Sequence, residues 1–569
     1  MSDIVQPIAL PTAVARELAA YPAHLQQLLF NRGITTAAAA QDFLIPSYDD
    51  HLHDPFLLPD IERAVERVQQ AVAAGERIVI FSDYDCDGIP GAVVLHDLLH
   101  AIGHTNFANV IPHRHYDGFG LSADTVTQIV ADHAPALIIT IDCGTSNVDA
   151  VAAATAAGVD VIITDHHEPG EILPEAVAVV NPKVGERYPF PHLCGAAVVY
   201  KLAQAVLQSG AYPLSPGQEK WWLDMVGVAT IADMVPLTGE NRVLAHYGLQ
   251  VLRKSRRPGV QQLLRKQRAQ QSTLSEDDIG FTIGPRINAA SRMDTPEDAF
   301  HLLATKDEGE AGARVAHLEK LNNARKAAVA SMTKDLHKRV EVVTELPPVL
   351  VFGNPEWRPS LVGLAANKLA EEYNRPAFLW GRDGNQAFKG SCRSNGSVSV
   401  VRLMEAAADH FAEYGGHHMS GGFTVLDAQI HTVGTALAHA YDTLGNDAIV
   451  PRTHSVDATI TLEMIDESFM EAQRQCAPFG MDNPKPLYLL SDVTPQAVER
   501  FGKQHEHTKL RFSNTGLATE AIAFFQSPEQ FTTLPTADTP CSLLTYVEDS
   551  YFMNRHQVRL RIVDVLPVT

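Results

Sequence analysis

A short apolar run that ends in three alternating carboxylates constrains the fold of this chain more than any other feature. Residues 78–82 (Ile-Val-Ile-Phe-Ser) are mostly β-branched or aromatic, as expected of a buried strand. Asp83, Asp85 and Asp87 follow at alternate positions. Ligands bind beyond the carboxyl ends of strands in open α/β sheets, and acids crowded there repel one another unless a cation lies between them. The stretch predicts a divalent-metal site; the alternatives are a solvated acidic turn or an isolated calcium loop, although the distal Glu of an EF-hand is missing.

Further apolar runs repeat this pattern, at residues 136–141, 159–164 and 176–180. The first ends in Asp142, and the second ends in Asp165, His166 and His167. Helix-like segments separate the runs, and strands that alternate with helices predict a parallel, doubly wound α/β sheet. Successive strand ends would then bring their polar side chains to one edge of the sheet.

A further acid, Asp233, lies alone in the apolar run 225–235, where a carboxylate is costly to bury unless it is paired or bound to a metal. A helix N-cap or a single salt bridge is the alternative explanation. A set of carboxylate and imidazole groups this large suits two octahedral divalent cations, Mn²⁺ or Mg²⁺, better than one tetrahedral zinc. Because neighbouring residues at a strand end point to opposite sides, we expect one of His166 and His167 to be a ligand and the other to face a phosphate.

Arginines and hydroxyls in glycine-rich loops are candidates for binding phosphate. Residues 112–120 hold Arg114, and residues 284–292 hold two arginines and an amide at the start of a predicted helix. A second α/β unit adds more such groups. The candidates are Arg114, Arg286, Asn288, Ser391, Arg393 and His417; each loop taken alone could equally be an ordinary turn.

The chain divides by composition and periodicity into five predicted parts. A charged, Ala-rich run without Gly or Pro is typical of one long helix that links two lobes. The last part carries short strands and few helices, which predicts a small all-β barrel, an OB-like fold able to stack single strands. The parts are a helical segment (1–60), a catalytic domain (61–300), the linking helix (301–345), an α/β domain (346–451) and the OB-like domain (452–569).

Charge and hydropathy limit the classes of function. The net charge of −22 argues against indiscriminate binding of nucleic acid, and the Lys/Arg-rich stretch 253–268 is either a solvated helix face or an edge that contacts phosphate. No run is apolar enough to span a bilayer and no signal peptide is evident, so we expect a cytoplasmic protein without a membrane. The six cysteines form no C-x-x-C pair, so neither zinc nor a disulfide framework is indicated.

Six motifs, in this order, resemble the DHH phosphoesterase superfamily and, within it, the RecJ family of bacterial exonucleases specific for single-stranded DNA. They are Asp-Tyr-Asp-Cys-Asp-Gly (83–88), Asp-Cys-Gly (142–144), Asp-His-His (165–167), Ala-Asp-Met-Val-Pro-Leu (232–237), Arg-Ile-Asn-Ala-Ala (286–290) and Gly-Gly-His (415–417). The chain departs from the family pattern at Cys86, Ser291, Arg358 and Cys392, none of which is a predicted ligand.

The resemblance implies a role for each matched residue. It implies that two ions are held by Asp83, Asp85, Asp87, Asp142, His166 and Asp233. Within that set Asp142 would bridge both ions, and His167 would lie near the scissile phosphate. Around the substrate, Arg114, Ser391 and Arg393 would surround the terminal phosphate, with Asn288 and His417 in the cleft.

The resemblance also implies the function: a 5′→3′ exonuclease that cleaves single-stranded DNA by a two-metal mechanism and releases 5′-mononucleotides in DNA repair and recombination. We expect a monomer that binds the 5′ end of the strand, with a single-strand-binding protein and a helicase as further partners. The alternatives are a DHH phosphodiesterase acting on short oligonucleotides or cyclic dinucleotides, and a non-catalytic DNA-binding scaffold. Replacing Asp142 distinguishes the scaffold from a catalyst. A scaffold would keep its affinity for single-stranded DNA, while a catalyst would lose its activity.

Overall fold

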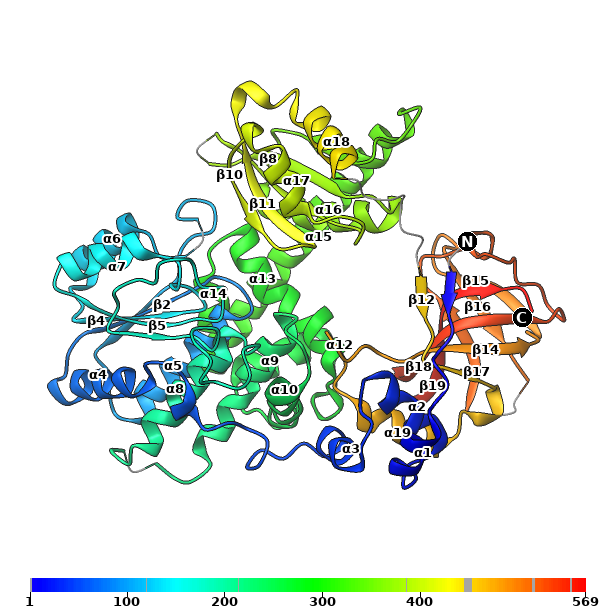
Figure 1. The fold of residues 1–569 in the computed structure, drawn as a ribbon, viewed down its shortest axis with the longest axis horizontal. Coiled ribbons are helices and arrows are strands. Elements are labelled where there is room, and N and C mark those ends of the chain that lie inside the picture. Colours follow the sequence, from blue (N-terminus) through cyan, green and yellow to red (C-terminus); the bar gives the residue numbers. More distant parts are fainter. Residues whose placement is uncertain are drawn as a thin grey trace. The chain divides into compact units, whose positions relative to one another are not determined.

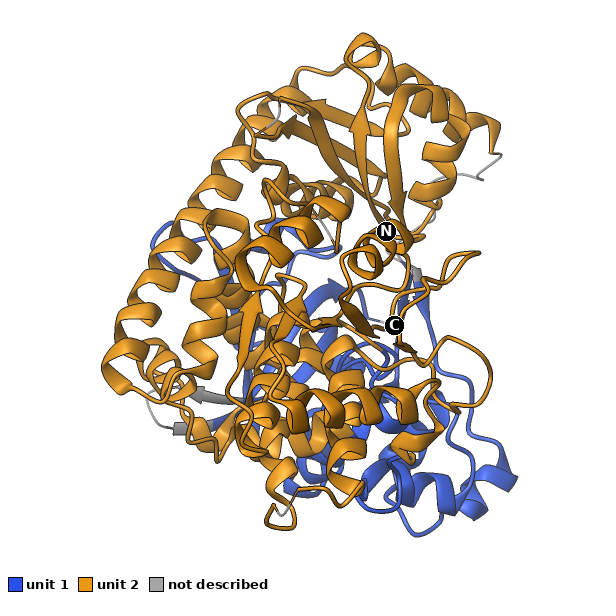
Figure 2. Ribbon diagram, turned by 90° about the vertical axis from the view of Figure 1, so that its left-hand side faces the viewer, with its two compact units in different colours: residues 1–52, 236–243, 451–569 blue, residues 53–235, 244–450 orange. Residues whose placement is uncertain are grey.

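The protein forms two compact units in a computed structural model that describes residues 3–118, 120–212, 214–384, 386–444, 453–513, 517–552 and 555–568. Unit 1 comprises residues 1–52, 236–243 and 451–569, and unit 2 comprises residues 53–235 and 244–450 (Figure 2). No helix within the described ranges is long and apolar enough to cross a membrane.

Unit 2 is built on a five-stranded sheet in the order β3-β2-β4-β5-β6, with every neighbouring pair parallel. This confirms the predicted parallel α/β fold. The sequence does not predict β3, because it is a short edge strand of half-buried residues without an apolar run. The strands are β2 Ile78–Ser82, β3 Phe107–Val110, β4 Leu137–Ile141, β5 Asp160–Thr164 and β6 Ala178–Val180.

Helices cover both faces of this sheet, with α6 and α7 on one face and α4, α5 and α8 on the other (Figure 1). β2 and β4 are buried along their whole length, so their apolar runs show no alternation. The helices of this lobe are α4 Ile61–Ala74, α5 Gly88–Ala101, α6 Ala123–His133, α7 Val148–Ala156, α8 Gly195–Gln208 and α9 Leu223–Ala232.

A helical region follows and ends in the long helix predicted from the sequence, α15, which spans Glu308–Glu341. A π-helical turn, Ile279–Ile283, lies directly before α13. The basic stretch 253–268 is partly buried, since Arg257 binds Asp224 and Asp97. The other helices are α10 Gly239–Leu252, α11 Pro258–Gln267, α12 Glu276–Asp278, α13 Gly284–Met293 and α14 Glu297–Ala304.

The second lobe of unit 2 is the predicted α/β unit. Its sheet has the order β10-β11-β9-β8-β7, in which only β7 and β8 are parallel. The elements are β7 Leu350–Gly353, α16 Pro359–Tyr373, β8 Ala377–Arg382, β9 Phe388–Arg393, α17 Val400–Ala406, β10 Phe411–Gly416, β11 Ser420–Val425 and α18 Val433–Thr443.

Unit 1 holds the predicted all-β domain, a seven-stranded sheet in the order β13-β14-β18-β19-β17-β16-β15. The sequence predicts the strands near 458, 487, 509, 521, 542 and 557 but not β15. The elements are β12 Thr453–Ser455, β13 Ala458–Ile460, α19 Glu467–Cys476, β14 Leu487–Val493, β15 Ala497–Phe501, β16 His507–Arg511, β17 Ala518–Ala523, β18 Cys541–Phe552 and β19 Arg555–Leu566.

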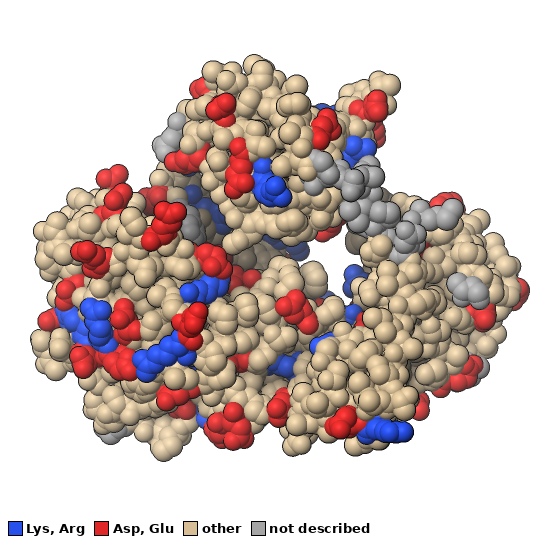
Figure 3. Space-filling model, viewed as in Figure 1, with Lys and Arg blue, Asp and Glu red and all other residues tan. Residues whose placement is uncertain are grey.

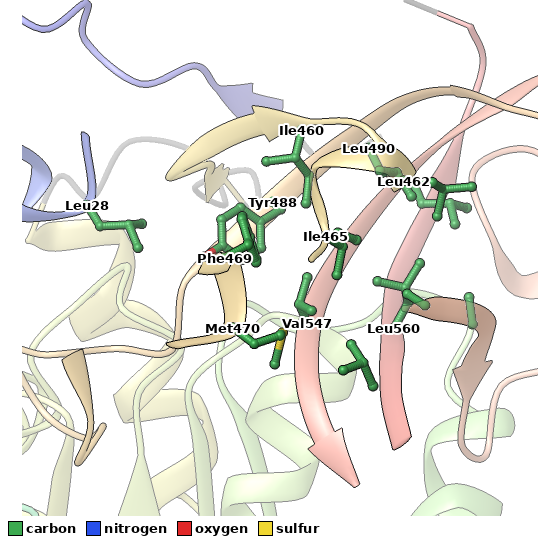
Figure 4. Close-up of a cluster of buried hydrophobic side chains, with 14 of the residues drawn as sticks. Leu28, Ile460, Leu462, Ile465, Phe469, Met470, Tyr488, Leu490, Val547 and Leu560 are labelled. Carbon is green, nitrogen blue, oxygen red and sulfur yellow. The ribbon is translucent and has the colours of Figure 1, made fainter. Parts of the chain in front are cut away.

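The N-terminal residues belong to this same unit. Leu28 of α2 shares one buried apolar cluster with Phe469, Tyr488 and Leu560 (Figure 4). β1 pairs in parallel with β12. No sequence pattern indicates this packing, and composition alone sets residues 1–60 apart. The N-terminal elements are β1 Asp3–Val5, α1 Thr12–Glu17, α2 Ala23–Asn31 and α3 Ala37–Leu44.

Candidate metal centre and phosphate site

The carboxyl ends of β2, β4 and β5, together with the C-terminus of α9, which carries Asp233, bring all the predicted metal ligands together. Three overlapping groups have their ligand atoms within 4.8 Å of one another, and Asp142 and His166 each belong to two of them. His166 Nε2 lies 3.1 Å from Asp142 Oδ1, 3.6 Å from Asp87 Oδ2 and 3.8 Å from Asp233 Oδ2. The groups are Asp83–Asp85–Asp142, Asp87–His166–Asp233 and Asp142–His166–His167.

The backbone at this edge is folded to hold the acids. Asp142 has a φ of 60°, and a Cβ at Gly195 would lie 2.6 Å from the Asp142 Cβ, so helix α8 can begin this close only with glycine there. The amides of Gly195 and Ala196 donate to the two carboxylate oxygens of Asp87, at 2.6 and 2.8 Å. The N-terminus of α8 therefore fixes Asp87 by charge-assisted hydrogen bonds.

Electrostatics favour a cation at this position. Burial, together with the neighbouring carboxylates, raises the pKa of Asp83 and of Asp142 well above the usual range. Burial and then the nearby Asp85 raise the pKa of Asp87 to about 6, and burial and then Asp87 raise that of Asp233 to about 9. Asp83 Oδ1 and Asp142 Oδ1 are buried and accept no hydrogen bond within the described part of the chain. Oxygen ligands with raised pKa values and unused acceptors fit divalent cations such as Mn²⁺ or Mg²⁺.

His167 is held by Asp165, a contact to which sequence reasoning assigns no role. Asp165 Oδ1 lies 2.8 Å from His167 Nδ1, and Asp165 also accepts from the amides of His166 and Thr145. Burial alone would raise the pKa of Asp165, but these bonds hold it below its usual range. Burial would lower the pKa of His167, but the bond to Asp165 and the negative charges of Asp165, Asp87 and Asp83 together raise it. The sequence does contain a signal for this contact, because Asp165 stands immediately before the two histidines in the Asp-His-His motif.

A cluster of arginines adjoins the acids. The Arg114 guanidinium lies 4.8 Å from the ring centre of Tyr84, the residue between Asp83 and Asp85. Burial, followed by repulsion from Arg114 and Arg325, lowers the pKa of Arg292 to about 9, and Asp85 and Arg393 act on it as well. We call Arg114, Arg292 and Arg393 the arginine cluster. The chain as a whole is acidic, with a net charge of −22, so this local cluster of positive charges is a site where an anion would bind.

The second lobe supplies Arg393 and Ser391, which lie on β9 next to the first turns of α16. A Cβ at Gly363 would lie 3.0 Å from Arg393 Nη2 and 3.3 Å from Ser391 Oγ, so these two side chains are neighbours. Arg292 joins the lobes because its Nη1 donates to Ser360 O at 2.7 Å.

One other predicted site residue lies elsewhere, a second is exposed in a turn that adjoins the end of β9, and a third has another partner. Arg286 binds Glu319 of α15 at 2.7 Å, away from the arginine cluster. His417 is exposed in the turn between β10 and β11. Asn288 Oδ1 accepts from the Cys86 amide at 3.1 Å, in the loop that carries the acids. Arg292 takes the place that sequence reasoning assigns to Arg286.

Lysines and arginines are interspersed with acids on the face shown in Figure 3, and the described part of that face carries no broad basic surface. Recognition of an anion therefore rests on the local cluster described above.

A parallel sheet with acids at its carboxyl edge, joined by a long helix to a second α/β lobe, defines a DHH-type phosphoesterase. The sequence matches the DHH family N-terminal domain over residues 77–230, the DHHA1 domain over 346–443 and the RecJ OB domain over 456–564.

Comparison with individual proteins identifies the family within this class of phosphoesterases. The chain is 33% identical to the single-stranded-DNA-specific exonuclease RecJ of Bacillus subtilis, over 94% of this chain and 67% of that protein. It is 31% identical to the exonuclease of the same name from Salmonella typhimurium, over 76% of this chain and 78% of that one. The crystal structure of Thermus thermophilus RecJ with Mn²⁺ matches with a TM-score of 0.84 at 26% identity, over 100% of this chain and 80% of that one. The chain belongs to the RecJ family.

Proposed function

We propose that this protein is a single-stranded-DNA-specific 5′→3′ exonuclease that uses two divalent cations and releases 5′-mononucleotides. One observation carries the proposal: the arginine cluster touches the acidic loop itself, through Arg114 on Tyr84. A terminal phosphate bound by the cluster would hold the first nucleotide of a strand against the metal ligands. The relatives are named as single-stranded-DNA-specific exonucleases.

Each group of residues would have its own role in the proposed reaction. Asp83, Asp85, Asp87, Asp142, His166 and Asp233 would hold the cations, with Asp142 shared between them. Bound cations would supply Lewis-acid stabilisation and lower the pKa of a bound water. The arginine cluster and Ser391 bind the 5′-phosphate. This contact would set the polarity of digestion, because a strand bound here through an internal phosphate would not place its 5′ end at the metal ligands.

His167 would donate a proton to the leaving group. Its Nδ1 bonds Asp165, and in the protonated ring Nε2 also carries a proton, which it would donate. When water attacks phosphorus, the bond to the 3′ oxygen of the terminal nucleotide breaks, and that oxygen takes the proton from His167. The products are a 5′-mononucleotide and a strand with a new 5′-phosphate, which the arginine cluster can bind in turn.

We further infer a cytoplasmic monomer that acts in DNA repair and recombination. A helicase and a single-strand-binding protein would be its partners, because a nuclease that needs an unpaired 5′ end depends on proteins that expose and present one.

The test uses purified protein, Mn²⁺ and one single-stranded DNA labelled in separate samples at its 5′ or 3′ end. We expect the 5′ label to appear at once as a mononucleotide while the 3′ label descends a ladder. Asp142→Ala should lower the rate by at least about 10³-fold, because it removes a ligand shared by both ions, and should keep the native circular dichroism.

Other results contradict the proposal in distinguishable ways. Intact long strands with rapid cleavage of di- to pentanucleotides would indicate a phosphodiesterase for short substrates. Unchanged turnover in Asp142→Ala would refute the assignment of the metal ligands.

A further inference from the structure

Strand β3 is an open edge of the five-stranded sheet in unit 2. It is the last strand in the order β3-β2-β4-β5-β6 and pairs with β2 on one side. Across this pair, Ile78 N donates to Asn106 O at 3.1 Å. Because the direction of the peptide groups alternates along a strand, those of Phe107 and Asn109 point away from β2. Within the described part of the chain, these outward N–H and C=O groups have no backbone partner.

A hollow of about 390 Å³ runs along this open edge and is lined by residues of β3, α5 and α14. Phe107 and Asn109 line it, and so do Thr105 and Ile111, the next residues of the same alternation. The hollow therefore follows the row of outward peptide groups and leaves them uncovered. Edge strands are usually protected by charged residues, by proline or by a covering segment, yet residues 107–110 (Phe-Ala-Asn-Val) carry no charge.

The two helices contribute aromatic rings to the hollow. The ring centre of His96 on α5 lies 5.2 Å from that of Phe107 and 5.5 Å from that of Phe300 on α14. His100 lies one turn further along α5, with its ring centre 4.6 Å from that of His96. Burial lowers the pKa of His96 to about 4, so this ring is neutral at pH 7. The rings together form a surface that would accept an apolar side chain.

The charge around the hollow is negative. Its lining includes the acids Glu297 and Glu310, and no Lys or Arg is among the described residues that line it. Glu310 is paired with Arg314 at 2.8 Å. Glu297 accepts from the hydroxyl of Thr295 and forms no ion pair within the described ranges. A segment that carries Arg or Lys is therefore complementary to the hollow, whereas a second copy of this edge would bring like charges together.

We propose that an extended segment of a partner protein adds a strand to β3, with an apolar side chain among the aromatic rings and an Arg or Lys at Glu297. Backbone hydrogen bonds to Phe107 and Asn109 would provide affinity, and the two side chains would provide specificity. Residues 112–118, which carry Arg114, follow directly after this edge, so the bound segment would lie next to that loop. The inference is independent of the proposed function, because binding at the edge requires neither metal nor DNA.

The test selects peptides from a display library of short random sequences on the purified full-length protein. The library is counter-selected on Asn109→Pro, which removes an outward N–H but no hydrogen bond of the ladder to β2. Asn109→Ala is the matched control, because it keeps the N–H and loses only the side-chain amide that bonds His96. We expect selected peptides to combine apolar residues with Arg or Lys, to bind the wild type and Asn109→Ala alike, and to bind Asn109→Pro at least about tenfold more weakly.

Two further measurements distinguish strand addition from contacts of side chains alone. N-methylation of a selected peptide at one set of alternate residues should abolish binding, and methylation at the other set should preserve it, because only one set directs its N–H groups to β3. Glu297→Gln should weaken binding of the peptide about tenfold and leave binding of its analogue with norleucine in place of Arg or Lys unchanged.

Three results would overturn the proposal. The first is a selection that enriches no peptide on the wild type, or enriches the same peptides on Asn109→Pro. The second is equal loss of binding from both sets of N-methyl groups, a measurement that decides the matter even if circular dichroism shows that Asn109→Pro does not fold. The third is a dimer of the wild type in light scattering that Asn109→Pro dissociates, since the edge would then bind a second copy of this chain.

Discussion

At the scale of single residues, the pair Asp165–His167 connects structure to proton transfer. The carboxylate of Asp165 is buried, yet amides and the imidazole keep it ionised, and its charge in turn favours the protonated His167. A general acid must hold its proton at the working pH, so in the role proposed for His167 its raised pKa would extend activity toward higher pH.

Asp165→Asn should therefore move the pH profile. The amide can still accept a hydrogen bond but carries no charge, so the pKa of His167 falls. Because the rate is lost as pH rises through that pKa, the alkaline limb of kcat/KM should shift to lower pH, with a loss of about 10-fold to 100-fold at pH 8. A pH series of initial rates at saturating Mn²⁺ measures this. Asp160→Asn, at the start of the same strand, is the control, and an unmoved limb in Asp165→Asn would contradict the assignment.

At the scale of elements, helix α13 has two functions on two faces. Arg292 belongs to the arginine cluster, the proposed phosphate site, while Arg286 ties α13 to α15 through Glu319 and to α11 through Gln267. Arg286 also donates to Thr282 O at 2.7 Å, within the π-helical turn. The ion pair is largely buried, with 7% and 19% of the two side chains exposed.

Arg286→Ala should consequently act on stability and not on recognition of the DNA end. Loss of one partner leaves Glu319 uncompensated, at a cost of about 3 kcal/mol in the free energy of unfolding. Arg114→Ala should do the reverse: an unchanged unfolding midpoint and weaker binding of 5′-phosphorylated strands relative to 5′-hydroxyl strands. Chemical denaturation and end-specific binding assays measure the two effects. A loss of end discrimination in a folded Arg286→Ala protein would restore Arg286 to the phosphate site.

At the scale of the whole molecule, the chain leaves one compact unit and returns to it twice. Residues 236–243 belong to unit 1, where the Arg242 guanidinium donates to the carbonyl oxygens of Phe43, Gln475, Cys476 and Ala477. All the candidate metal ligands lie in unit 2.

Calorimetry should detect a separate unfolding transition for each of the two units. The candidate metal ligands all lie in unit 2, so Mn²⁺ should raise the transition of that unit by roughly 5 °C at about 100 times the dissociation constant and leave the transition of unit 1 in place. EDTA should reverse the shift and abolish hydrolysis. In Asp142→Ala the shift should be lost; an equal rise in both transitions would mean that the units unfold as one.

The sequence by itself determined the parallel sheet, the acids at its edge, the long helix and the all-β domain. These follow from local periodicity, and the rule that parallel strands carry ligands at their carboxyl ends joins Asp83, Asp142 and His166 without any knowledge of packing. The tertiary structure decided that Arg292 and not Arg286 joins the arginine cluster. These arginines are six positions apart on one helix, and only the packing of α13 on α15 determines which face of the helix meets the site. Tertiary structure also decided that residues 1–52 join the C-terminal unit, because contacts such as Arg242 with Phe43 and Cys476 link residues hundreds of positions apart and leave no periodic trace in the sequence.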